Sequence, residues 1–159
     1  MTRRTEISAG ILAFRRTMRL EVLLAHPGGP YWRKRDEGAW SIPKGVVESN
    51  DVLACARREF NEETGLTAAG DVVPLTPLRQ KSGKLVHAFA LEADYDLTGF
   101  TSNSFEMEWP PRTGHMTSFP EVDRIAWFGI ATARRKILPG QLPFIDELVE
   151  RLKREAAVE

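Results

Sequence analysis

The stretch from Pro43 to Leu66 constrains the fold of this chain more than any other segment. Its second half predicts a helix. Asn50 or Asp51 can cap the helix start, because an Asn or Asp side chain accepts hydrogen bonds from the free amides of the first turn. Gly65 can end the helix, because glycine readily adopts the left-handed conformation found there. We therefore expect one helix between these two ends.

Two stripes of side chains run along this expected helix, at about 3.6 residues per turn. The first stripe is apolar and should face a core; it consists of Leu53, Ala56 and Phe60. The second stripe carries three carboxylates at i, i+3 and i+4, which are Glu59, Glu62 and Glu63. Such carboxylates repel one another by about 0.2–0.5 kcal/mol per pair on an open helix. The stripe is therefore either a solvated acidic face or a site for a hard divalent cation such as Mg²⁺ or Mn²⁺.

The sequence around this helix resembles the Nudix box. From Arg58 to Leu66 the residues R-E-F-x-E-E-x-G-L match every defined position in the second half of the box, and Gly45 matches its first glycine. The first half departs from the pattern. One loop residue is missing between Gly45 and the helix, and Asn50 or Asp51 stands where the family has a supporting Glu. The context of the box favours the cation site over the solvated face.

The resemblance implies a fold, a reaction and a cofactor. The fold would be a Nudix-type α/β/α sandwich around a mixed β-sheet, formed by residues 1–159 as a single domain. The reaction would be hydrolysis of a nucleoside diphosphate linked to another moiety, with Mg²⁺ or Mn²⁺ as cofactor and a small nucleotide-type molecule as substrate. The implied metal ligands are Glu59, Glu62 and Glu63, with the backbone of Gly45.

Further side chains are assigned to catalysis and substrate binding. Arg58 would hold one of the box carboxylates by a charge-assisted bond. A general base could be a box Glu that the metal does not saturate, or a carboxylate from outside the box. The outside candidates are Glu106, Glu108 and Glu121, of which we assign Glu108 to the catalytic set. Basic side chains can bind phosphate groups, and aromatic side chains can stack on a nucleobase. The assigned substrate-binding residues are Lys44, Trp40, Arg33 and Arg112.

Composition excludes several classes of partner. The chain has 22 Lys and Arg residues and 22 Asp and Glu residues, so its formal net charge is zero. It therefore lacks the excess of positive charge that binding to duplex nucleic acid or to an anionic membrane requires. The single cysteine, Cys55, excludes an internal disulfide and fits a reducing compartment. No apolar run approaches the ~20 residues that span a bilayer. We therefore expect a cytoplasmic protein, with an oligomeric state that the sequence leaves open.

The order of the other segments predicts a mixed sheet with one helix from the box and one at the C-terminus. Strands are expected at 8–14 and 21–26 as a hairpin, at 40–42, at 78–81 and 84–93 as a second hairpin, at 105–109 and at 124–128. Residues 68–77 allow at most an edge strand, and residues 110–122 are expected to be a loop. Helices are expected at 130–138 and from Leu142 or Pro143 onward. The last helix should pack on the core through Phe144, Ile145, Leu148, Val149 and Leu152.

Several functions remain open at this point. The substrate could be an ADP-sugar, a nucleoside triphosphate or a dinucleoside polyphosphate. With its shortened loop, the chain could also be a Nudix-like module that binds a nucleotide without cleaving it, or a structural protein-interaction domain. The retained glutamates of the box favour catalysis, because a pure binder has no reason to keep their mutual repulsion.

Overall fold

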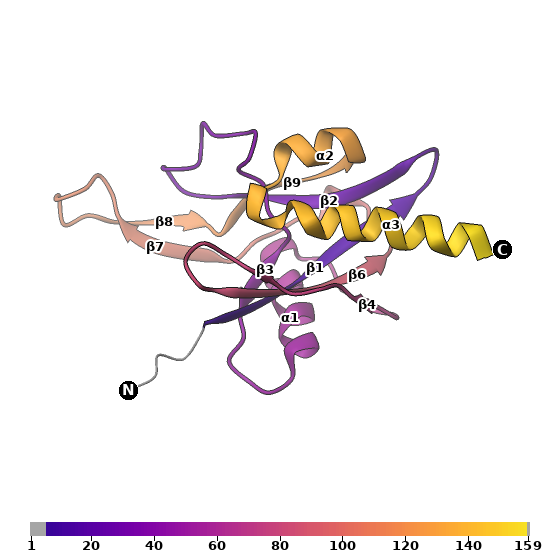
Figure 1. Ribbon diagram of the computed structural model, residues 1–159. Helices are drawn as coiled ribbons and strands as arrows, with labels where there is room; N and C mark the ends of the chain where they lie inside the picture. Colours follow the sequence, from indigo (N-terminus) through magenta and orange to yellow (C-terminus); the bar gives the residue numbers. More distant parts are fainter. Residues whose placement is uncertain (1–5, 159) are drawn as a thin grey trace.

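The computed structural model describes residues 6–158 of the chain (Figure 1). Its strands are β1 (Ile7–Arg16), β2 (Leu20–Pro27), β3 (Lys44–Val46), β4 (Val73–Pro74), β5 (Leu78–Arg79), β6 (Leu85–Glu92), β7 (Ser104–Glu108), β8 (Met116–Pro120) and β9 (Val122–Gly129). Its α-helices are α1 (Val52–Thr64), α2 (Ile130–Lys136) and α3 (Leu142–Val158). Short 3-10 helices cover Leu97–Gly99 and Pro139–Gln141.

Strand β1 lies at the centre of a mixed sheet. The strand order is β4-β6-β1-β2-β9, while β3 pairs with β1 and β5 pairs with β6. Strands β1 and β6 are parallel, and the other pairs are antiparallel. Strands β7 and β8 form a separate antiparallel sheet, which extends away from the body of the molecule (Figure 1). The expected mixed sheet and both expected hairpins are confirmed.

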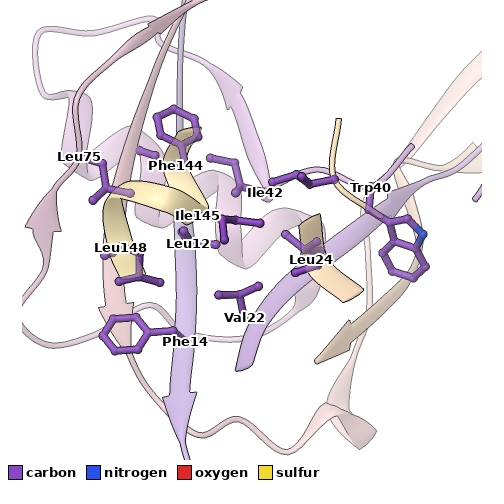
Figure 2. Close-up of a cluster of buried hydrophobic side chains, with 14 of the residues drawn as sticks. Leu12, Phe14, Val22, Leu24, Trp40, Ile42, Leu75, Phe144, Ile145 and Leu148 are labelled. Carbon is purple, nitrogen blue, oxygen red and sulfur yellow. The ribbon is translucent and has the colours of Figure 1, made fainter. Parts of the chain in front are cut away.

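Alternating side chains of β1 supply two cores, because successive residues of a strand point to opposite faces. Ile11 and Ala13 pack with Phe60 of α1 on one face. Leu12 and Phe14 pack on the other face with buried side chains of α3, which are Phe144, Ile145 and Leu148 (Figure 2). Val149 and Leu152 pack against the same cluster, as expected. Helix α1 thus covers one face of the sheet and α2 and α3 cover the other (Figure 1), which confirms the α/β/α sandwich.

The ends of α1 settle which residue caps it. Asp51 is the N-cap, and its side chain accepts a hydrogen bond from the Ala54 N–H at 2.9 Å. Gly65 ends the helix at φ 76°, in the left-handed region. The apolar stripe differs by one position from the expected one, since Val52 rather than Leu53 packs against the core with Ala56 and Phe60.

Two local expectations were wrong. Residues 110–122 are not simply a loop, because they include β8, which pairs with β7 from Ser104 opposite Pro120 to Glu108 opposite Met116. The proline-rich turn before β8 hid the alternation of its side chains. Residues 40–42 form only isolated bridges, Trp40 with Ile137 and Ser41 with Ala25, and the regular strand begins at Lys44.

Among residues 6–158, no helix combines the length and the apolar character that crossing a membrane requires.

Candidate active site

Five carboxylates line one cavity of about 370 Å³ beside α1 and β3. Three of them belong to α1 and are the box residues Glu59, Glu62 and Glu63. The other two, Glu48 and Glu121, lie in loops. Lys44, Gly45, Arg58 and Asn103 complete the polar lining. We call this space the carboxylate cavity. Negative charge gathered in this way is costly without a cation, since like charges in a shared site disfavour each other's ionisation.

The fold fixes each carboxylate by specific contacts. The Arg58 guanidinium lies 3.2 Å from Glu62 Oε1 and 3.4 Å from Glu59 Oε1, so it contacts both carboxylates. Glu63 accepts a hydrogen bond from the backbone N–H of Lys44 at 3.1 Å. Glu121 is placed through its backbone, whose N–H donates to the Asn103 carbonyl at 2.7 Å.

Gly45 allows the closest approach in the site. A Cβ atom built at this position would overlap the carboxylate of Glu59. Strand β3 can therefore lie directly against α1 only because residue 45 has no side chain. The Glu59 carboxylate occupies the space that a side chain at residue 45 would take, so it lies directly against the backbone of β3.

Burial sets the protonation of these groups. Removal from water raises the pKa of Glu63 to about 8. Burial, and then the charge of Glu62, raise the pKa of Glu59. Burial, and then the nearby charge of Lys84, lower the pKa of Lys44. Desolvated carboxylates with raised pKa values in a cavity are typical of functional sites.

The donor set of the carboxylate cavity suits a hard divalent cation. Carboxylate oxygens are the ligands that Mg²⁺ and Mn²⁺ prefer, and Gly45 lets the Glu59 carboxylate lie against the backbone of β3 at the edge of the carboxylate cavity. Within residues 6–158, no three acidic, His or Cys side chains are already arranged as ligands around one point. The glutamates are instead held by Arg58 and by the Lys44 N–H. The residues fit a cation, although ligation needs them to turn toward one another.

A second cavity of about 220 Å³ adjoins the first and shares Lys44, Glu63 and Glu121 with it. Its remaining walls are largely apolar and are formed by Ala25, Pro27, Trp32, Ala39, Ile42, Val122 and Leu138, with Ser41 between them. We call this space the central cavity. The Arg35 guanidinium lies 5.4 Å from the centre of the Trp32 ring and supports it by a cation–π contact. The central cavity is largely apolar with a few polar groups, and it lies beside the charged carboxylate cavity. Two such neighbouring spaces suit a ligand in which an organic ring is attached to phosphate groups.

Lys44 is brought to this site, but several of the other predicted residues are not. Trp40 belongs to the buried cluster shown in Figure 2 and is 4% exposed. Its ring packs against those of His26 and Phe128 and is not part of the lining of the central cavity. Arg33 and Arg112 are exposed and line neither cavity. Glu108 lies on β7, where its carboxylate accepts a hydrogen bond from the Arg112 N–H, away from both linings.

Sequence reasoning missed Glu48 and Trp32. Glu48 lies in the loop before α1 and lines the carboxylate cavity. It was not predicted as a site residue, because it stands in the first half of the box, where the sequence departs from the family pattern. Trp32 directly precedes Arg33 in a loop of aromatic and basic residues, and only Arg33 was assigned to substrate binding from the sequence. Glu121 was one of three outside candidates for the base, and it is the one that lines both cavities.

The raised pKa of Glu63 predicts how the stability of the metal-free protein depends on pH. The native carboxyl keeps its proton up to about pH 8, whereas the unfolded chain releases it near pH 4.5. The native state binds more protons between these values, so the free energy of unfolding should fall as pH rises from 5 to 8. At about 1.4 kcal/mol per pKa unit, the loss is on the order of a few kcal/mol.

Urea unfolding at several pH values, with a chelator present, measures this loss. The Glu63→Gln variant should show a flatter profile than the wild type, since glutamine does not titrate. Parallel profiles for the two proteins would contradict the assignment of the slope to Glu63.

The chain matches one protein-domain model and many solved structures. The NUDIX domain model matches residues 4–148. A C. elegans Ap4A hydrolase in a binary complex has 19% sequence identity and a TM-score of 0.65, over 92% of this chain and 98% of that one. The NUDIX domain of Shewanella oneidensis NrtR, complexed with ADP ribose, has 15% identity and a TM-score of 0.68, over 95% and 90% of the two chains. A mutT/nudix family protein from Listeria innocua has 16% identity and a TM-score of 0.66, over 99% and 100% of the two chains.

At these identities the solved structures establish the fold, and the match to the domain model establishes the family. The chain belongs to the NUDIX family. The prediction of a Nudix hydrolase, acting on phosphoric anhydride bonds, is confirmed at the level of the family. The comparison with curated proteins found no match.

Proposed function

We propose that this protein is a divalent-metal-dependent pyrophosphohydrolase, which cleaves a nucleoside diphosphate linked to another moiety. The observation that carries the proposal is the carboxylate cavity, which is lined by three glutamates of α1 together with Gly45. The neighbouring central cavity, with its aromatic wall at Trp32, provides room for a nucleoside beside those carboxylates. The same arrangement supports a small nucleotide as the partner.

The charged groups of the cavity have separate tasks in this proposal. Glu59, Glu62 and Glu63, with the Gly45 backbone, would hold Mg²⁺ or Mn²⁺. When bound, such a cation neutralises the charge of the diphosphate and makes water a stronger nucleophile near neutral pH. Arg58 keeps Glu59 and Glu62 turned toward the cavity through the contacts described above. Lys44, which lines both cavities, supplies positive charge to a substrate phosphate.

Glu121 is the proton acceptor that the geometry supports best. It is a carboxylate from outside the box that lines both cavities, so it lies where the diphosphate and the nucleoside would meet. Its side chain is exposed, and a solvated carboxylate accepts a proton from an attacking water and passes it to solvent. Glu106 and Glu108 are also exposed, but they lie on β7 and line neither cavity.

A panel of substrates tests the proposed function. ADP-ribose, ATP and diadenosine tetraphosphate are incubated with the protein and Mg²⁺ or Mn²⁺, and the products are separated by chromatography. We expect at least one of them to be cleaved at a phosphoric anhydride bond. Nucleotide binding in calorimetry with no product from any member would instead identify a binding module. Absence of both metal and nucleotide binding would indicate a structural role.

A further inference from the structure

The His26 side chain is completely buried near the end of β2, yet both nitrogens of its ring have polar partners. Nε2 donates a hydrogen bond to the backbone carbonyl of Arg35 at 2.6 Å. Nδ1 lies 2.8 Å from a carboxylate oxygen of Asp123. A carbonyl only accepts hydrogen bonds, and so does an ionised carboxylate, so each of the two contacts contains a proton. The ring therefore bridges two segments that lie far apart in the sequence.

The segment on one side of this bridge is the loop after β2, which carries Trp32, the aromatic wall of the central cavity. Arg35 contacts Trp32 in two ways. Its backbone N–H donates to the Trp32 carbonyl at 2.9 Å, and its guanidinium lies 5.4 Å from the centre of the Trp32 ring. A hydrogen bond that holds the Arg35 carbonyl therefore also restricts where the Trp32 ring can lie.

The segment on the other side carries Glu121, the proposed proton acceptor, two residues before Asp123. The Glu121 carbonyl accepts a hydrogen bond at 2.9 Å from the N–H of Gly28, at the start of the same loop. The loop is thus tied to residues 121–123 at both of its ends, directly at Gly28 and at the other end through the His26 ring. The aromatic wall and the carboxylate of the central cavity are therefore fixed to one short segment.

We propose that His26 and Asp123 are positioning residues for the nucleoside, which hold the Trp32 ring in place as the wall of the central cavity relative to Glu121. This inference rests on the proposed function, because Trp32 has a ligand only if the central cavity binds a nucleoside. Neither His26 nor Asp123 is part of the lining of the two cavities, so they act through Trp32. Loss of the bridge frees the aromatic wall and leaves the carboxylate cavity in place. It should therefore raise KM and change kcat little.

Two substitutions at residue 26 separate the two contacts of the ring. A Gln side chain places its amide nitrogen close to the position of Nε2 of histidine, so His26→Gln keeps a donor for the Arg35 carbonyl. The shorter side chain in His26→Asn reaches only toward Asp123. We expect His26→Asn to raise KM on the best substrate by about tenfold, as for the loss of one buried hydrogen bond, with kcat changed less than about twofold. His26→Gln should stay within about threefold of the wild type in both constants.

Asp123 allows the same test at a less buried position, since its side chain is 27% exposed. In Asp123→Asn the amide can donate to Nδ1 of a neutral ring, which still donates to the Arg35 carbonyl through Nε2–H. Asp123→Asn should therefore keep the wild-type KM and Asp123→Ala should raise it, a pattern that separates positioning from an effect of charge. His115→Asn is the matched control, because it changes an exposed histidine that lines neither cavity. It should keep both constants.

Two measurements that need no hydrolysis separate this inference from the proposed function. Amide hydrogen exchange, followed by mass spectrometry, should be faster over residues 28–35 in His26→Asn than in His26→Gln or the wild type. Calorimetry with Mg²⁺ and α,β-methylene-ADP, whose P–C–P link resists hydrolysis, should show binding weakened about tenfold in His26→Asn alone.

Unchanged exchange of the loop in His26→Asn, or equal affinities and KM values for His26→Asn and His26→Gln, would overturn the positioning role and leave the proposed hydrolysis standing. A wild type that neither binds the analogue nor cleaves any member of the substrate panel would contradict the proposed function, and the role of Trp32 as a nucleoside wall with it.

Discussion

Glu62→Gln should lower kcat on the best substrate by roughly two to three orders of magnitude, while the fold is kept. Glutamine has nearly the same shape and helix propensity as glutamate, so α1 should form normally. The substitution removes one negative charge from the proposed cation site and leaves Arg58 with Glu59 as its only carboxylate partner there. Steady-state kinetics and circular dichroism measure the two effects.

Glu106→Gln is the matched control, because it makes the same chemical change on β7, outside the carboxylate cavity. It should keep near-normal turnover. Comparable rates for Glu62→Gln and the wild type would remove Glu62 from the set of proposed metal ligands.

Gly45→Ala should abolish most of the activity, with a fall in kcat/KM of about 100-fold or more. The new Cβ occupies the space of the Glu59 carboxylate, which is the far end of a flexible side chain. The carboxylate can therefore turn away without unfolding the protein, but a displaced ligand no longer holds the cation in place. We expect a small change in melting temperature beside the large kinetic loss.

Gly99→Ala provides the control for this substitution. A Cβ at Gly99 meets no atom within 4 Å, and its backbone is not left-handed. This variant should behave like the wild type in kinetics and in thermal unfolding. If Gly45→Ala retained full activity, the close packing of β3 against α1 would have no catalytic role.

The sequence predicted the elements whose signals are local. The ends of α1 follow from a capping side chain and a C-terminal glycine, and the structure needed only to choose Asp51 over Asn50. Strand β8 was missed, because the proline-rich turn before it obscures its short alternating pattern and its pairing with β7 is not visible in a local pattern. The parallel pairing of β1 with β6 was likewise not fixed by local pattern, since it depends on contacts between distant segments.

The site residues that lie on α1 could be predicted from the sequence, because their spacing along one helix places them on one face. The site residues that lie in loops could not, because their positions depend on the tertiary fold. Glu59, Glu62 and Glu63 share a face of α1 by spacing alone. Trp40 and Trp32 are both tryptophans close to the box in sequence, and only the tertiary fold buries the first and leaves the second at the central cavity. The preference for Glu121 over Glu108 depends in the same way on how the chain returns to α1 after the β7–β8 hairpin.

The central claim is that the carboxylates of α1 hold a divalent cation that hydrolysis requires. The most direct test is the rate of nucleotide release from the best substrate as a function of Mg²⁺ concentration, after chelation of residual metal, for the wild type and Glu62→Gln. The account predicts no turnover without Mg²⁺, saturation in the wild type, and a much lower rate or a much higher Mg²⁺ requirement in the variant. Turnover in the wild type that persists without any divalent cation, or identical curves for the two proteins, would contradict it.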